Sequence, residues 1–138
     1  MTMSTQTAKK PAVRQESEKE EISVLFGKIF SFNSSLKLIH WHVTGKGSYA
    51  AHLSLDQAIE TLLEATDRLV ETGYALLGNL DIVIPETKRP DDYEGHIEAY
   101  YEYMEHKRPL FSEAFVQSIL DDYQEGIQQL LFRLKRLQ

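Results

Sequence analysis

The chain has 138 residues, enough for one domain with a single core but not for two independent domains. Its formal net charge is −6, which argues against a protein that binds nucleic acid over its whole surface and fits one that attracts cations. The absence of cysteine excludes disulfides, thiolate metal sites and cysteine nucleophiles. No uninterrupted apolar run approaches the roughly 18 residues of a membrane span, and the polar N-terminus lacks the apolar core of a signal peptide. We therefore expect a cytoplasmic protein that does not associate with membranes.

The first predicted elements are a tail and a long helix. Residues 1–16 have no periodic apolar pattern, so we expect a flexible tail there. Ser17 and Glu20 have capping-box spacing, which predicts a helix start. The helix is expected over 17–43, because apolar residues recur at helical spacing in that range. They are Ile22, Leu25, Phe26, Ile29, Phe32, Leu36 and Ile39.

A second long helix follows after a short loop. Gly45 and Gly47 interrupt the helical pattern and predict that loop. The helix is expected over 48–77, since Gly78 is a suitable C-terminal stop. Its apolar stripe consists of Leu55, Ile59, Leu62, Leu69 and Leu76.

The second half of the chain predicts a linker and two more helices. Two prolines prevent a helix over 79–90, and we expect the apolar residues 82–84 to pack against the rest of the protein. Helical spacing then predicts helices over 92–107 and 112–137. With no strand-type alternation, the chain is predicted to form an all-α four-helix bundle over residues 17–138.

Four potential metal ligands lie on the second predicted helix. His52 and Asp56 are four residues apart, as are Asp67 and Glu71, so each pair points to one side of the helix. Eleven residues, about three turns, separate Asp56 from Asp67, which places both pairs in one angular sector. That sector lies about 110° from the apolar stripe. Each pair taken alone is also compatible with an ordinary solvated surface.

One metal ion cannot bind all four of these side chains on a single helix. At about 1.5 Å per residue, Asp56 and Asp67 are roughly 16 Å apart along the axis. Either the helix carries two weak half-sites, or a second copy packs antiparallel against it across a two-fold axis passing near Thr61 and Leu62. In the second case the first pair of one chain meets the second pair of the other, and the short loop brings His40 to the same site.

The donor types indicate which metals would bind. Two imidazoles and three carboxylates suit iron(II), manganese or zinc. Single-chain di-iron bundles use Glu-x-x-His pairs inside the core. None of the five histidines here has a glutamate three residues before it, which favours a site at an interface.

The stretch HWHVTGKGSYAAHLSLD, from His40 to Asp56, together with Asp67 and Glu71, resembles the Dps family of miniferritins. His40, His52, Asp56, Asp67 and Glu71 match the five ligand positions of that family without a gap. The resemblance implies a ferritin-like fold and a di-iron site shared by two subunits. It extends over roughly residues 22–77.

The resemblance also implies a function. The family's activity is oxidation of iron(II), often with hydrogen peroxide, followed by storage of the ferric product in a hollow dodecamer. Trp41 matches a tryptophan beside the site that donates electrons or quenches radicals, and His42 stands where the family usually has asparagine. Zinc or manganese could take the place of iron.

Two other functions remain open at this stage. One is a ferritin-like metal-binding structural or cargo subunit of a larger assembly, without storage activity. The other is a nucleoid-binding protein that acts through its tail. The tail's basic residues are interleaved with acidic ones, so we expect DNA binding to be weak or absent. These basic residues are Lys9, Lys10, Arg14 and Lys19.

Overall fold

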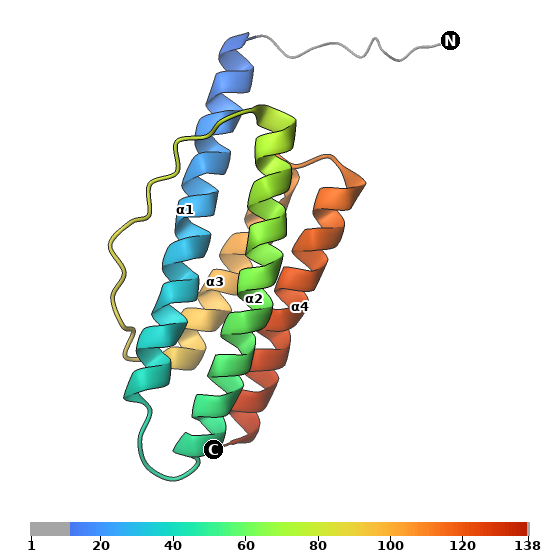
Figure 1. Ribbon diagram of the computed structural model, residues 1–138. Coiled ribbons are helices and arrows are strands. Elements are labelled where there is room, and N and C mark those ends of the chain that lie inside the picture. Colours follow the sequence, from blue (N-terminus) through green and yellow to red (C-terminus); the bar gives the residue numbers. More distant parts are fainter. Residues whose placement is uncertain (1–11, 138) are drawn as a thin grey trace.

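The computed structural model describes residues 12–137, with side chains from Glu16 onward, and shows four α-helices packed against each other (Figure 1). No strand occurs among these residues, so the prediction of an all-α bundle of four helices is confirmed. The elements are α1 (Ala12–His42), α2 (Ser48–Leu77), α3 (Tyr93–Lys107), the short 3-10 helix η2 (Arg108–Leu110) and α4 (Ala114–Arg136).

The start of α1 differs from the prediction. The helix begins at Ala12, so residues 12–16, which we expected in the tail, are helical. Neither glycine nor proline stands between Ala12 and Ser17, and the Lys19 ammonium lies 3.9 Å from the Glu16 carboxylate three residues earlier. Such pairs support a helix, so the capping-box spacing did not mark its first turn. Residues 1–11 of the predicted tail lie outside the described part of the chain.

The first two helices are antiparallel neighbours. Lys37 near the end of α1 bonds Asp56 near the start of α2, at 3.2 Å. One turn earlier on α1, Asn33 donates to Thr66, which lies further along α2, at 3.0 Å. The residue numbers therefore run in opposite directions along the contact between the helices.

Residues 78–92 form an extended crossover that follows α1 in the direction of its chain (Figure 1). A Cβ on Gly27 would collide with the Val83 carbonyl oxygen, so glycine is required for this close approach. Further along, the Ser31 hydroxyl lies 2.8 Å from the Thr87 hydroxyl. The crossover thus spans much of the bundle and returns the chain to the end at which α1 finishes.

The apolar residues of the crossover were predicted to pack against the bundle, and this prediction is only partly correct. Ile82 packs against the core, whereas Val83 is 77% exposed and Ile84 is 54% exposed. In an extended chain successive side chains point to opposite sides, so three consecutive residues cannot all face α1.

The last two helices complete the bundle. The His96 ring near the start of α3 lies 2.8 Å from the Ser35 hydroxyl near the end of α1. Lys135 near the end of α4 bonds Glu98 at 2.8 Å, so α3 and α4 are antiparallel. In consequence α2 and α3 point the same way, joined by one long crossover.

A buried polar chain joins all four helices in one layer. The Tyr123 hydroxyl on α4 donates to the Asn33 amide oxygen on α1 at 2.9 Å, and Asn33 donates in turn to Thr66 on α2. The Tyr100 hydroxyl on α3 lies 2.8 Å from the Tyr123 hydroxyl. Because buried polar groups are costly when unpaired, this layer fixes the axial positions of the helices relative to one another.

Helix α1 supplies a large part of the core. By length and composition alone, its segment Glu16–His42 could cross a membrane, but 56% of its most apolar window is buried inside the bundle. The core helix of a bundle meets the same criterion, so this is weak evidence for a membrane span. Its fully buried side chains include Leu25, Phe26, Ile29, Leu36 and Ile39.

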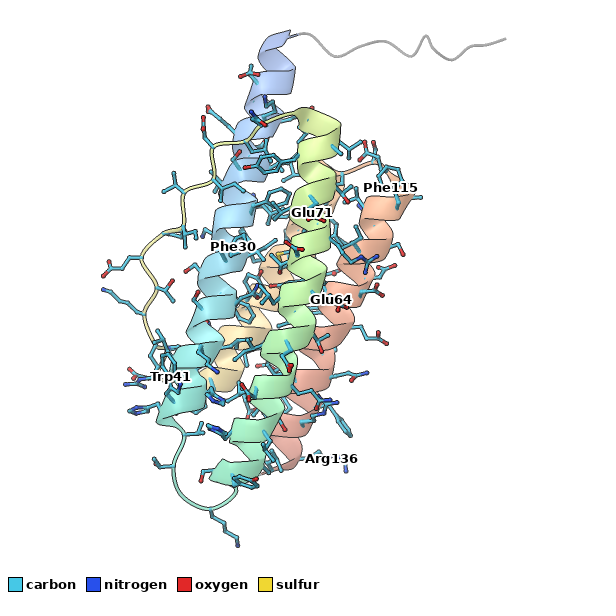
Figure 2. All side chains as sticks on the ribbon, in the orientation of Figure 1. Phe30, Trp41, Glu64, Glu71, Phe115 and Arg136 are labelled. Carbon is cyan, nitrogen blue, oxygen red and sulfur yellow. The ribbon has the colours of Figure 1, made fainter. Side chains whose placement is uncertain are left out.

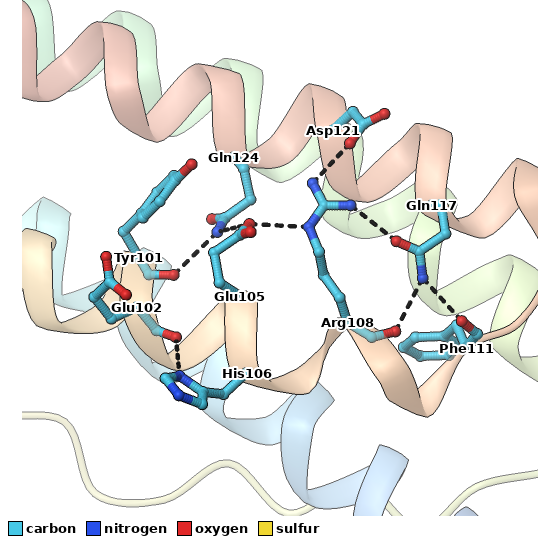
Figure 3. A network of polar contacts seen from close by, with 9 residues as sticks. All are labelled: Tyr101, Glu102, Glu105, His106, Arg108, Phe111, Gln117, Asp121 and Gln124. Atoms are coloured by element: carbon cyan, nitrogen blue, oxygen red, sulfur yellow. Dashed lines mark hydrogen bonds and ion pairs between the residues drawn. The ribbon is translucent and has the colours of Figure 1, made fainter.

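A polar network also ties α3 and η2 to α4 (Figure 3). The Arg108 guanidinium donates to Glu105 at 2.9 Å, to Gln117 at 2.9 Å and to Asp121 at 2.7 Å. Gln124 donates to the Glu105 carboxylate as well, at 2.9 Å. These contacts hold the turn between the two helices in place.

Candidate metal centre

The site is built where α1 ends and α2 begins. Gly45 and Gly47 have φ values of 87° and 80°, a left-handed conformation that favours glycine, and they reverse the chain within a few residues. The turn places His40, in the last turn of α1, beside His52 of α2. Their rings are stacked, with centroids 3.6 Å apart and planes inclined by 29°. His40 is buried, with 5% of its surface exposed.

Each of these rings hydrogen-bonds the backbone of the other residue. His40 Nδ1 lies 3.1 Å from the His52 carbonyl oxygen, and His52 Nδ1 lies 3.1 Å from the His40 carbonyl oxygen. A carbonyl can only accept, so both Nδ1 atoms carry hydrogen and donate. In the neutral rings the unprotonated nitrogen is therefore Nε2. Histidines that bind metals commonly have this arrangement, in which a second hydrogen bond fixes the tautomer and orients the ring.

Asp56 adds a carboxylate to the histidine pair. His40 Nε2 lies 3.9 Å from Asp56 Oδ1. The Lys37 ammonium donates to the same oxygen at 3.2 Å, and this hydrogen bond is the main cause of the lowered pKa of Asp56. Lys37 also lies over the Trp41 ring, 5.8 Å from its centroid. The lysine thus holds the carboxylate ionised in the place that a metal cation would share.

Lys37 did not emerge as a site residue from the sequence. Lysine is not a metal ligand when charged, so a search for ligand types passes over it. A signal was nonetheless present, because Lys37 precedes Trp41 by four residues and therefore lies on the same side of the helix.

Asp67 and Glu71 lie elsewhere in the single chain. Both are exposed on α2, roughly 16 Å along the axis from the first pair at about 1.5 Å per residue. Among the described residues no group of three or more histidine, aspartate and glutamate side chains could hold a metal ion. The structure brings His40, His52 and Asp56 near one another, but they are not arranged as such a group, and Asp67 and Glu71 lie away from them.

The helix face that carries these ligands is also rich in exposed apolar side chains. At about 100° of rotation per residue, four exposed apolar side chains point within about 60° of the direction of Asp56 around the helix axis. Tyr49 is 75% exposed, Leu53 49%, Leu63 53% and Tyr74 37%. Large apolar groups gathered on one exposed face are typical of a surface that another protein covers.

The positions on this face are symmetric about the middle of α2. His52 and Glu71, Asp56 and Asp67, and Tyr49 and Tyr74 are each centred between positions 61 and 62. If a second copy of the chain packed antiparallel about that point, each residue of a pair in one chain would lie level with the other residue of that pair in the second chain.

The side chains at the centre of this face differ from those expected. We expected a two-fold axis to pass near Thr61 and Leu62, but Leu62 is fully buried and lies near Gly126 of α4. Glu60 and Leu63 are the exposed residues of the ligand face at that level.

The two remaining aromatic candidates are at the end of α1. Trp41 is 66% exposed beside the histidine pair (Figure 2). His42 is exposed as well, and the structure describes no metal-binding group that includes it.

Comparison of the chain with family models, curated proteins and solved structures gives no match.

Proposed function

We propose that this chain is a ferritin-like miniferritin of the Dps type, which binds and oxidises iron(II) at a site shared by two copies and then sequesters it. The observation that carries the proposal is the reciprocal bonding of His40 and His52, which directs both Nδ1 atoms to backbone carbonyls and leaves the Nε2 atoms for a metal, with that of His40 3.9 Å from Asp56 Oδ1. The bundle with one long crossover supports the fold assignment, because ferritin-like folds have that connection.

The second half of the site would come from a second copy. Asp67 and Glu71 of that copy would lie level with Asp56 and His52 if two α2 helices packed antiparallel. The completed set of two imidazoles and three carboxylates suits iron(II) as substrate, and zinc or manganese as competitors. Oxidation of two iron(II) ions by one hydrogen peroxide consumes two protons and yields two iron(III) ions and two water molecules. Trp41, which is exposed and follows His40 directly in the chain, would supply an electron to a radical side product.

Subunit mixing tests the shared site. His52→Ala and Glu71→Ala should each abolish rapid iron(II) oxidation in their own homo-oligomers, because every site lacks one ligand. A mixed dimer has one site with both changes and one with neither, so random exchange should restore about a quarter of all sites. The measurement is the rate of iron(III) formation after peroxide addition, with exchange confirmed by native mass spectrometry.

The control mixes two variants whose altered ligands come from the same chain in each site. Mixing His52→Ala with Asp56→Ala damages both sites of every mixed dimer, so no activity should return. Equal recovery in the two mixtures, or none in either despite exchange, would contradict a site shared across α2.

The alternative is a ferritin-like metal-binding subunit that serves a structural or cargo role. Its support is the short α3, 15 residues against 31 in α1, and the exposed Val83 and Ile84 on the crossover. These apolar side chains offer contacts outside the α2 face. Protein that binds zinc with the shared-site stoichiometry, but oxidises iron(II) no faster than buffer, would favour this alternative.

A further inference from the structure

A cleft of about 470 Å³ lies on the other side of α1, away from the candidate metal centre. Its walls come from α1, from the crossover and from α3. The volume is within the range of sites that bind small molecules. The side chains that line it include Lys28, Phe32, Lys88, His96, Tyr100 and Tyr103.

One wall of the cleft is a run of aromatic rings. The Phe32 ring is stacked on Tyr100, with centroids 3.7 Å apart and planes inclined by 5°. His96 continues the run beyond Phe32 at 5.3 Å, and Tyr103 continues it beyond Tyr100 at 6.1 Å. Phe32 and Tyr100 are themselves buried, so a ligand in the cleft would contact the edges of these rings and the half-buried rings of His96 and Tyr103.

The rim of the cleft is basic, in a chain whose net charge is −6. Lys28 and Lys88 line it, against a single acidic residue, Glu86. The Lys28 ammonium lies 5.0 Å from the Tyr103 ring centroid, and Lys107 lies 5.6 Å from the same ring. The ammonium groups of Lys28 and Lys107 are thus both held over the Tyr103 ring of the aromatic wall.

Four other clefts of the described chain have a different charge. Acidic residues outnumber basic ones in three of them, and the fourth has one of each. The basic rim is therefore not a general property of this surface.

Polar groups at the base of the cleft are already oriented. The Ser35 hydroxyl donates to the Phe32 carbonyl at 2.6 Å, so His96 Nε2 must donate to Ser35, from which it lies 2.8 Å away. His96 Nδ1 is then the acceptor nitrogen of a neutral ring. Burial lowers the pKa of His96, which keeps the ring neutral near pH 7.

We propose that this cleft binds a small planar aromatic anion, with its ring against the exposed edges of the aromatic wall and its acidic group at Lys28 and Lys88. A neutral aromatic compound would use the wall but not the rim, and a simple inorganic anion would use the rim but not the wall. The site is independent of the metal centre.

Two fluorescent dyes test the two parts of the proposal separately. 8-Anilinonaphthalene-1-sulfonate carries the anionic group, and N-phenyl-1-naphthylamine lacks it. We expect saturable binding of the sulfonate at one site per chain. Lys28→Ala and Lys88→Ala should each weaken sulfonate binding about three- to tenfold and change binding of the neutral dye less than twofold. Lys46→Ala, which removes a lysine from another cleft, should change neither.

Filling the cleft should remove both dyes. Ala99 lines it on α3 and is exposed, so Ala99→Trp would block the wall without a buried substitution. Circular dichroism would check that this variant is folded. In the unaltered protein, the NMR signals of the His96 ring should shift on addition of the sulfonate and saturate with the fluorescence. Non-saturable fluorescence, equal losses in Lys46→Ala, or an unmoved His96 signal would overturn the proposal.

Discussion

The two pairs of candidate ligands on α2 have different surroundings. His52 and Asp56 lie against the end of α1, where His40 stacks on one and Lys37 bonds the other. Asp67 and Glu71 are exposed, and the structure describes no hydrogen bond or ion pair between them and the other side chains of residues 16–137. One half of the proposed site is thus oriented within the chain, and the other half consists of exposed carboxylates.

This difference has a physical explanation. An imidazole must present one particular nitrogen, so it needs a partner that fixes its tautomer and orientation, and the turn between α1 and α2 supplies two backbone carbonyls for that purpose. A carboxylate is an acceptor at either oxygen and can remain solvated until a cation arrives. In the proposed shared site, the chain would therefore orient the imidazoles by itself, and a second copy would supply the carboxylates Asp67 and Glu71.

The largest expected effect concerns association of two copies. Leu63 is 53% exposed at the centre of the ligand face, level with Glu60 of a second, antiparallel copy. Leu63→Glu would place like charges together on both sides of the axis, so we expect the dimer dissociation constant to rise tenfold or more. A tenfold rise corresponds to a loss of roughly 1.4 kcal/mol of association free energy. Sedimentation equilibrium measures this constant.

Phe132→Glu is the matched control, because Phe132 is 59% exposed on α4, away from the ligand face. It should leave association through α2 unchanged. If both variants dissociate equally, or neither does, the symmetric face on α2 is not the contact between copies.

The next effect concerns the buried polar layer of Asn33, Thr66, Tyr100 and Tyr123. Tyr123→Phe removes the hydroxyl that donates to Asn33 and lies beside the Tyr100 hydroxyl. Leaving these buried groups unpaired should lower the free energy of unfolding by about 1–3 kcal/mol. Urea unfolding followed by circular dichroism measures the loss. Tyr101→Phe is the control, since the structure describes no hydrogen bond of the Tyr101 hydroxyl with residues 12–137.

The same layer predicts a dependence on alkaline pH. Burial raises the pKa of both Tyr100 and Tyr123 above the ordinary value of 10.0. The unfolded chain therefore releases these protons first, so the stability that the neutral tyrosines contribute is complete below about pH 10 and declines as the pH rises above it. Tyr123→Phe should show a shallower decline. A parallel decline in both proteins would contradict this assignment.

The smallest expected effect concerns Lys37, whose ammonium group bonds the Asp56 carboxylate that a metal ion would also bind. Lys37→Gln removes the cation that bonds Asp56, so the pKa of that carboxyl should rise toward its ordinary value. Zinc would no longer compete with an ammonium, and its affinity should rise about two- to fivefold, as expected for loss of an exposed ion pair. Isothermal titration with zinc measures this, with Lys46→Gln as control. A fall in affinity would instead assign Lys37 a role in positioning Asp56.

The sequence alone determined the helices and the spacing of the ligands. Apolar residues at helical intervals predict which face of each helix is buried, and spacings of four and eleven residues place His52, Asp56, Asp67 and Glu71 in one sector. Both are local properties of a regular helix. The mismatch between an axial separation of roughly 16 Å and the length of a metal–ligand bond followed from the same regularity.

Only the tertiary structure decided how the helices meet. The stacking of His40 on His52, the bond from Lys37 to Asp56 and the basic aromatic cleft beside the crossover all depend on the position of one segment relative to another. Helical periodicity describes each segment by itself, whereas relative position is set by long-range contacts such as the polar layer of Asn33, Thr66, Tyr100 and Tyr123.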